Sequence, residues 1–157
     1  MASYTHQILE FFDALPRQGR LICLDVGEKT IGLAMSDASR MVASPLQLIE
    51  RTKFSKDIAI VSEHIAEHGV SGVVIGYPVN MDGSEGPRCQ STRQFARDMA
   101  TKVALPTLLW DERLSTVAVN RMMIDEADLS RKRRGELVDK LAATYMLQGV
   151  LDALGNH

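Results

Sequence analysis

The chain has 157 residues, of which 45% are hydrophobic and 24% charged, and its formal net charge is −2. This length fits one compact domain with a buried core, and the composition is ordinary for a globular protein. The charge excludes a global attraction to nucleic acid, so any such binding requires a local basic patch.

The cysteines and the apolar segments indicate the cellular compartment in which the protein is expected. Cys23 and Cys89 have no CxxC spacing, and Cys23 lies in an apolar run, which is typical of a buried thiol in a reducing compartment. No apolar run approaches the roughly 18 residues of a membrane span. Glu10 and Asp13 interrupt the N-terminal segment, which therefore does not resemble a signal peptide. These features predict a cytoplasmic protein with no membrane-spanning segment.

The N-terminal segment carries apolar side chains at helical spacing, namely Tyr4, Ile8, Phe11, Phe12 and Leu15. This pattern predicts an amphipathic helix over residues 4–15, ended by Pro16 and Gly19. We interpret residues 1–19 as a helical extension and residues 20–157 as the main domain. We expect the helix to dock on the core of that domain, and binding to a partner is the alternative.

Three extended segments open the main domain. An apolar run over 21–25, closed by Gly27, predicts a buried strand and a tight turn. Residues 31–36 are its expected hairpin partner. Residues 41–49 form a third expected strand, in which Pro45 is tolerable at an edge or a bulge.

Helices and strands then alternate. The pattern predicts a helix from 54 to about 69, a strand at 72–76, a polar loop at 80–86, a helix starting at Pro87, a strand at 107–110, and two helices at roughly 115–125 and 134–154. Alternation of strands and helices implies parallel pairing, and a leading hairpin implies an antiparallel edge. The sequence therefore predicts an α/β fold, a mixed five-stranded sheet with helices on both faces.

Three carboxylates are candidates for chemistry. Asp25 ends the first predicted strand and Glu112 follows the last, where functional groups gather in parallel sheets, although such acids are also common caps and loop residues. Asp139 shares a helix face with three apolar residues, Ala143, Met146 and Val150. A buried, unpaired carboxylate there would be costly. A position near the helix N-terminus, where the dipole favours negative charge, is the alternative explanation.

The three carboxylates would repel one another if the fold brought them together. Two charges about 5 Å apart at an effective dielectric constant of about 20 repel by roughly 3 kcal/mol. A cluster of all three therefore requires divalent cations, and oxygen ligands favour Mg²⁺ or Mn²⁺ over zinc. Two such ions would activate an attacking water and stabilise a leaving oxygen.

Several cationic residues are candidates for phosphate contact. Lys29 lies in the turn after the first strand, and Arg113 follows Glu112, where it could grip a phosphate or pair with a neighbouring acid. The run Arg131, Lys132, Arg133 and Arg134 is the sharpest basic feature. Four cations placed just before a helix oppose its dipole, so a nucleic-acid backbone explains them better than local stability does.

Four ordered blocks cover nearly everything from Leu21 to Leu154: LDVGEKTIGLA at 24–34, VIGYPVNMDG at 74–83, DERLST at 111–116 and VDKLAA at 138–143. Together they resemble the YqgF family, also called RuvX, whose members are named as Holliday junction resolvases or as pre-16S rRNA nucleases. The resemblance implies a ribonuclease H-like fold and an acidic metal site formed by Asp25, Glu112 and Asp139. It also implies hydrolysis of phosphodiester bonds, with structured RNA as the favoured substrate and branched DNA as the second.

Three competing functions remain. Actin-like ATPases share an Asp-x-Gly hairpin, but they need a second such loop and a longer chain. Residues 64–68, HIAEH, fit the pattern of an inverted zinc metalloprotease, although no third ligand is evident. A non-catalytic RNA-binding factor in ribosome assembly would keep the fold and the basic run.

Overall fold

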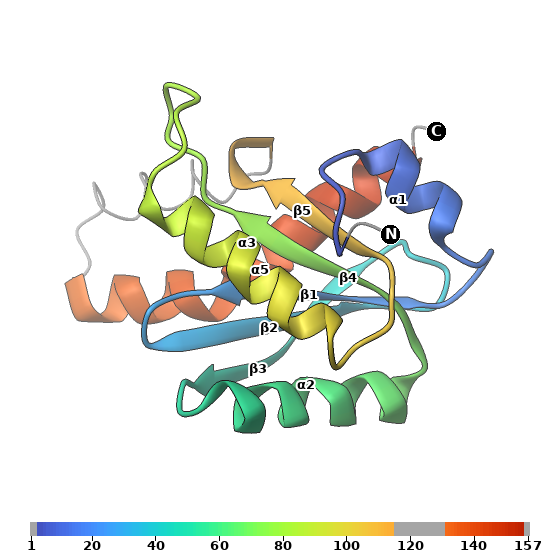
Figure 1. Cartoon of the computed structure of the whole chain (residues 1–157), viewed down its shortest axis with the longest axis horizontal. Helices are drawn as coiled ribbons and strands as arrows, with labels where there is room; N and C mark the ends of the chain where they lie inside the picture. The colour runs from blue at the N-terminus through green and yellow to red at the C-terminus, as the bar shows by residue number, and fades with distance from the viewer. Residues whose placement is uncertain (1–2, 115–130, 156–157) are drawn as a thin grey trace.

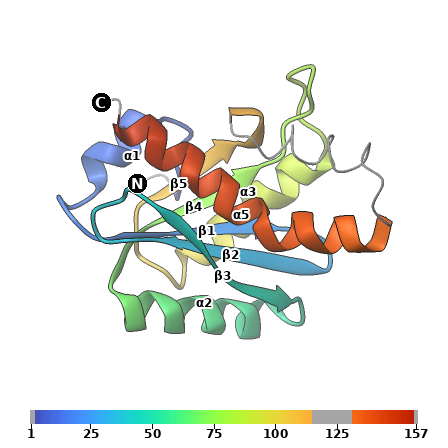
Figure 2. The same cartoon turned by 180° about the vertical axis from the view of Figure 1, so that it is seen from behind.

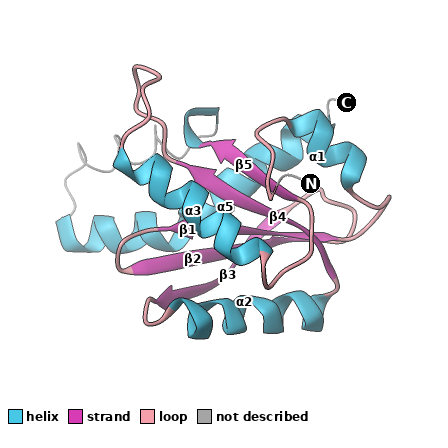
Figure 3. Cartoon of the chain, in the orientation of Figure 1, coloured by secondary structure: helices cyan, strands magenta, loops and turns pink. Residues whose placement is uncertain are grey.

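The structure is a computed structural model that describes residues 3–114 and 131–155, with side chains described over 3–114 and 141–155. Its elements in chain order are α1 (Ile8–Ala14), β1 (Arg20–Val26), β2 (Thr30–Ser36), β3 (Ala43–Glu50), α2 (Phe54–His68), β4 (Val70–Tyr77), α3 (Pro87–Ala100), β5 (Thr107–Asp111), a short 3-10 helix (Glu112–Leu114) and α5 (Arg131–Gly155). Figures 1 and 3 show their arrangement. The helix predicted at about 115–125 lies outside the described residues.

The five strands form one sheet in the order β3-β2-β1-β4-β5. β1 pairs antiparallel with β2 and β2 with β3, whereas β1, β4 and β5 run parallel. This confirms the predicted mixed sheet with a leading hairpin. Pro45 lies on the edge strand β3, opposite a register shift between Leu33 and Ala34, so the chain tolerates it where an edge and a bulge coincide.

Side chains of alternating direction divide the core into two layers. On β1, Ile22 and Leu24 pack with residues of α2 and α3, whereas Leu21 and Cys23 pack with residues of α1 and α5. The two opposite views show α3 in front of the sheet in Figure 1 and α5 in front in Figure 2. The predicted placement of helices on both faces is confirmed.

The helix ends follow from their local sequences, with two differences from the prediction. α2 ends at Gly69, which takes the left-handed conformation (φ 62°), and Pro87 opens α3 as expected. α1 begins only at Ile8, because Thr5 is extended and bridges to Leu108 of β5. The prediction that the basic run 131–134 precedes its helix is wrong, since α5 starts at Arg131.

Two further features of the structure are the state of the cysteines and the character of the helices. Cys23 and Cys89 are both free and buried, which confirms the prediction of a buried thiol made for Cys23 from its apolar context. Among the described helices, none combines the length and the apolar character needed to cross a membrane.

Candidate active site

Asp25 and Glu112 lie at the same end of the sheet. Asp25 is the penultimate residue of β1, and Glu112 directly follows β5. Because β1, β4 and β5 are parallel and in register, with Leu24 beside Ile75 and Ile75 beside Leu109, their carboxyl ends meet at one edge. Crevices at such edges are where open α/β sheets bind ligands.

The two carboxylates also share a face of the sheet, the one covered by α5. Asp25 follows Cys23 by two residues on β1, and Cys23 packs in the α5 layer. Glu112 is placed by its neighbour Gly76, where an added Cβ would lie 2.4 Å from Sδ of Met146 and 3.6 Å from Oε2 of Glu112. Gly76 therefore lets α5 approach the sheet beside the Glu112 carboxylate.

The negative charges of Asp25 and Glu112 both affect the pKa of the buried Cys23 thiol. Burial raises the pKa of Cys23 well above its ordinary value, and the negative charges of Asp25 and Glu112 raise it further. Both carboxylates therefore lie within electrostatic range of this buried thiol. Asp25 is half-buried and Glu112 is 9% exposed. Oxygen donors gathered in this way fit a hard divalent cation.

The third predicted carboxylate belongs to α5. Ala143, Met146 and Val150, which share its expected helix face, are fully buried against the sheet, so the predicted phase of this helix is confirmed. Asp139 lies four residues before Ala143 on the same helix. Its side chain, and those of the basic run Arg131, Lys132, Arg133 and Arg134, lie outside the described residues. Figure 1 shows the first turns of α5 at the same end of the molecule as the turn between β1 and β2.

Arg113 pairs with its neighbouring acid. Its Nη2 donates to Oδ2 of Asp111 at 2.7 Å, and its Nε lies 3.1 Å from both carboxylate oxygens. Although burial disfavours the charged form, these hydrogen bonds hold the pKa of Asp111 below its ordinary value. The Cβ direction of Gly83 points to Nη1 of Arg113 at 3.6 Å, so the loop at 80–86 reaches this arginine.

A polar cluster fixes that loop to the fold. The hydroxyl of Tyr77 donates to Glu85 and accepts from Arg93 of α3, and Arg93 also lies 3.5 Å from Glu85. Burial, followed by the hydrogen bond with Glu85, raises the pKa of Tyr77. Residues from the end of β4, the loop and α3 thus hold the loop in place beside Arg113.

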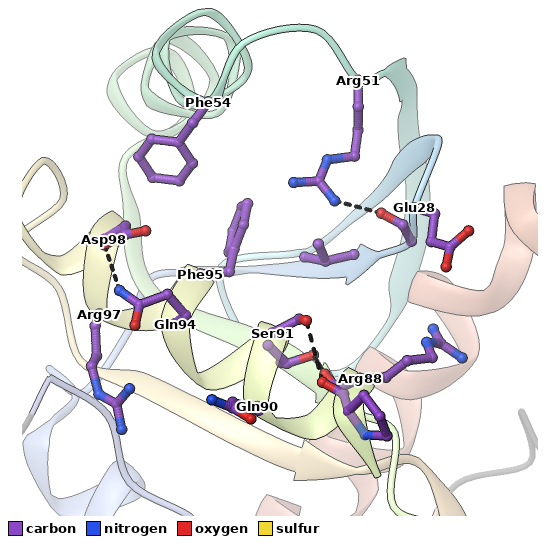
Figure 4. A pocket seen from close by; sticks show the side chains of 14 residues that line it. Glu28, Arg51, Phe54, Arg88, Gln90, Ser91, Gln94, Phe95, Arg97 and Asp98 are labelled. Carbon is purple, nitrogen blue, oxygen red and sulfur yellow. Dashed lines mark hydrogen bonds between the residues drawn. The ribbon is translucent and has the colours of Figure 1, made fainter.

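A groove of about 730 Å³ opens on the other side of the β1–β2 turn (Figure 4). The turn itself carries the exposed Lys29. The groove runs along α3 and is lined by Val26, Gly27, Glu28, Arg51, Phe54, Pro87, Arg88, Gln90, Ser91, Thr92, Gln94, Phe95, Arg97 and Asp98. Its three arginines outnumber its two acids, so the lining is net positive.

Aromatic packing holds one of these arginines in place. Nη1 of Arg51 donates to the carbonyl oxygen of Gly27 at 2.7 Å, and its guanidinium lies 5.9 Å from the centroid of the Phe95 ring. Phe54 meets Phe95 edge to face at 5.4 Å. Arg51 is therefore bound to the turn that follows Asp25, whereas Arg88 and Arg97 are exposed on α3.

Sequence reasoning missed these groove arginines and the Tyr77 cluster. A signal existed, because α3 carries Arg88, Arg93 and Arg97 within one helix. Arg93 contacts the loop cluster, whereas Arg88 and Arg97 line the groove. This division depends on the tertiary structure and cannot be seen in the local sequence. Gly76 was likewise unremarkable in sequence, and only packing against Met146 gives it a role.

Residues 19–153 match the family model described as "RuvX: Holliday junction resolvase". A protein of Cereibacter sphaeroides named "Putative pre-16S rRNA nuclease" is 58% identical over 94% of this chain and 91% of its own length. A protein of the same name from Caulobacter vibrioides is 55% identical over 94% of this chain and 95% of its own length.

Among solved structures, the chain is similar to RuvC of Thermus thermophilus in complex with a Holliday junction substrate. The TM-score is 0.52 at 12% identity, over 87% of this chain and 96% of that one. At this identity the similarity concerns the fold alone. With the sheet order described above, it confirms the predicted ribonuclease H-like fold.

Proposed function

Because the chain belongs to the RuvX family of nucleases, we propose that its nuclease active site lies at the carboxyl ends of β1 and β5, around Asp25 and Glu112. The observation that carries this proposal is their position at one edge of the sheet and on the face covered by α5. Asp139 of α5 completes the proposed triad, because its helix phase matches that of Ala143 and Met146.

The proposed triad would hold Mg²⁺ or Mn²⁺. The donors are carboxylate oxygens only, which suits hard divalent cations, and without cations their mutual repulsion would oppose folding. When bound, a pair of such ions activates the attacking water and stabilises the leaving oxygen of the cleaved phosphodiester. Gly76 leaves room for Met146 beside the Glu112 carboxylate.

Cationic side chains around the triad would hold the substrate backbone. We assign this role to Lys29, Arg113 and the run Arg131–Arg134, following their positions at the β1–β2 turn, after β5 and at the start of α5. Arg113 is oriented by its fork on Asp111, which leaves Nη1 directed toward the loop at Gly83. A phosphate at that point would meet an arginine already held in one geometry.

We propose structured RNA as the substrate, with the 5′ end of pre-16S rRNA as the cleavage site and ribosome biogenesis in the cytoplasm as the setting. The names of the relatives support this choice. The second candidate is a Holliday junction, favoured by the description of the family model. A non-catalytic role in ribosome assembly is the third, and it predicts RNA binding without cleavage.

The decisive experiment compares carboxylate variants on two substrates. Asp25→Asn, Glu112→Gln and Asp139→Asn are each expected to reduce cleavage at least 100-fold while the far-UV circular dichroism spectrum is unchanged. Asp152→Asn is the matched control, because Asp152 is an exposed carboxylate on α5, where it accepts from Gln148 at 3.0 Å. The substrates are a pre-16S rRNA fragment and a four-way DNA junction at the same stated salt, with Mg²⁺, with Mn²⁺ and with EDTA.

Each outcome has a distinct meaning. Cleavage that survives EDTA contradicts the metal site, and undiminished cleavage by Asp139→Asn contradicts its place in the triad. Faster cleavage of the junction than of the RNA overturns the choice of substrate. RNA binding without cleavage by the unaltered chain favours the assembly role.

A further inference from the structure

The C-terminal half of α2 carries a second group of metal-ligand side chains, apart from the carboxylate site. His64, Glu67 and His68 each offer a ligand atom, and among the described residues these atoms lie within 4.8 Å of one another. We propose that they bind one transition-metal ion of the Zn²⁺ class. This proposal concerns binding alone and does not depend on the nuclease activity.

Helical spacing brings the three side chains together. Positions i, i+3 and i+4 share one face of a helix, and the rings of His64 and His68 stack with their centroids 6.0 Å apart and their planes 15° apart. Zinc–ligand bonds of about 2.0–2.1 Å place two tetrahedral ligands about 3.3 Å apart. Closing the difference needs a small rotation of side chains, and Glu67, whose side chain is 71% exposed, is free to make it.

A hydrogen bond donated to another element orients His64. Its Nε2 lies 2.8 Å from Oε1 of Gln47 on β3, so Nε2–H donates and Nδ1 is left with a lone pair. Within the described part of the chain, that Nδ1 is buried and has no hydrogen-bond partner. A buried acceptor without a partner is costly. A cation held by Nδ1 would remove that cost, and histidine ligands commonly donate their other ring N–H in this way.

The donor set selects the ion. Two imidazoles and one carboxylate suit zinc and its neighbours, whereas Mg²⁺ prefers oxygen ligands and retains its water. The site would therefore not compete with the Asp25 and Glu112 carboxylates for Mg²⁺. Three protein ligands leave a fourth position to solvent.

Calorimetric titration of the full chain with ZnCl₂, in excess Mg²⁺ to occupy the carboxylates, tests the proposal. The unaltered chain should bind one equivalent and show a higher Tm with zinc. His68→Gln and Glu67→Gln, both at solvent-accessible positions, should each weaken binding at least tenfold. Gln47→Leu, which removes only the orienting acceptor, should weaken binding about 10–100-fold.

Two controls locate the bound ion. His6→Gln removes a histidine outside α2, and Asp25→Asn removes a ligand from the carboxylate site, so both variants should keep the one equivalent. Absence of saturable binding, or unchanged affinity in His68→Gln and Glu67→Gln, overturns the proposal. Loss of zinc binding in Asp25→Asn would also overturn it, because the ion would then belong to the carboxylates.

Discussion

At the scale of single residues, Gly76 determines how closely helix and sheet approach at the candidate site. On β4 it pairs with Trp110 of β5 and directly follows Ile75, the partner of Leu24 on β1, and Met146 of α5 fills the space that a side chain would occupy. A side chain at this position would require Met146 to move, and would disturb the packing of α5 against the sheet. If Asp139 acts with Asp25 and Glu112, the spacing between α5 and the sheet also affects their separation.

Gly76→Ala is expected to destabilise the protein by about 1–3 kcal/mol, because its Cβ would lie 2.4 Å from Sδ of the fully buried Met146. Urea denaturation measures the change. Gly155→Ala is the control, since an added Cβ there meets nothing within 4 Å. A Gly76→Ala variant as stable as the control would show that Met146 or α5 can move without cost.

At the scale of elements, α3 serves two surfaces at once. Arg93 fastens the loop at 80–86 through Tyr77 and Glu85, whereas Arg88 and Arg97 line the groove beside the β1–β2 turn. The groove begins at Val26 and Gly27, directly after Asp25. A single nucleic-acid strand that leaves the carboxylate site across the β1–β2 turn would enter this groove, whose lining is net positive.

Arg88→Gln is expected to weaken binding of a single-stranded RNA oligomer and to reduce the slope of log affinity against log salt by about 1, as loss of one phosphate contact does. Fluorescence anisotropy in EDTA measures binding without cleavage. Lys102→Gln removes an exposed cation that lies beyond α3 and outside the groove lining. Equal salt slopes for the two variants would exclude the groove from the RNA path.

At the scale of the whole molecule, the N-terminal segment is packed into the fold. Phe11 is 1% exposed and lies in the same layer as residues of α5. An added Cβ on Gly72 of β4 would lie 2.6 Å from Leu15 and 3.2 Å from Phe11. The absence of a side chain at Gly72 therefore allows the N-terminal segment to pack closely against β4. These contacts favour docking on the core over display of the helix to a partner.

Phe11→Ala is therefore expected to lower the free energy of unfolding by about 3–5 kcal/mol, the usual cost of emptying a buried aromatic site. Phe12→Ala, at the next position but 39% exposed, should cost less than about 1 kcal/mol. Guanidinium denaturation of both variants makes the comparison. Similar small losses in the two would mean that residues 1–19 are dispensable for stability.

Features that depend on neighbouring residues were predictable from the sequence, whereas features that depend on pairing between distant segments were not. Buried strands such as 72–76 and the helix opening at Pro87 were predictable, because apolar runs and a first-turn proline act locally. The start of α1 was missed because Tyr4 fits the helical spacing, while Thr5 is extended by pairing with a distant strand. Asp25 and Glu112 were found as strand-end acids, but their shared face depends on the register of β1, β4 and β5.

The bridge at Thr5 obstructs one edge of the sheet against pairing with a strand of another copy of the chain. Its amide donates to Thr107 at 3.0 Å and its carbonyl accepts from Leu109 at 2.8 Å, so the chain occupies part of the open margin of β5. At the opposite margin, Pro45 lacks an amide hydrogen and Gln148 accepts from the amide of Ala43 at 2.9 Å. Both margins of the described sheet are obstructed against intermolecular strand addition, the usual first step toward aggregation.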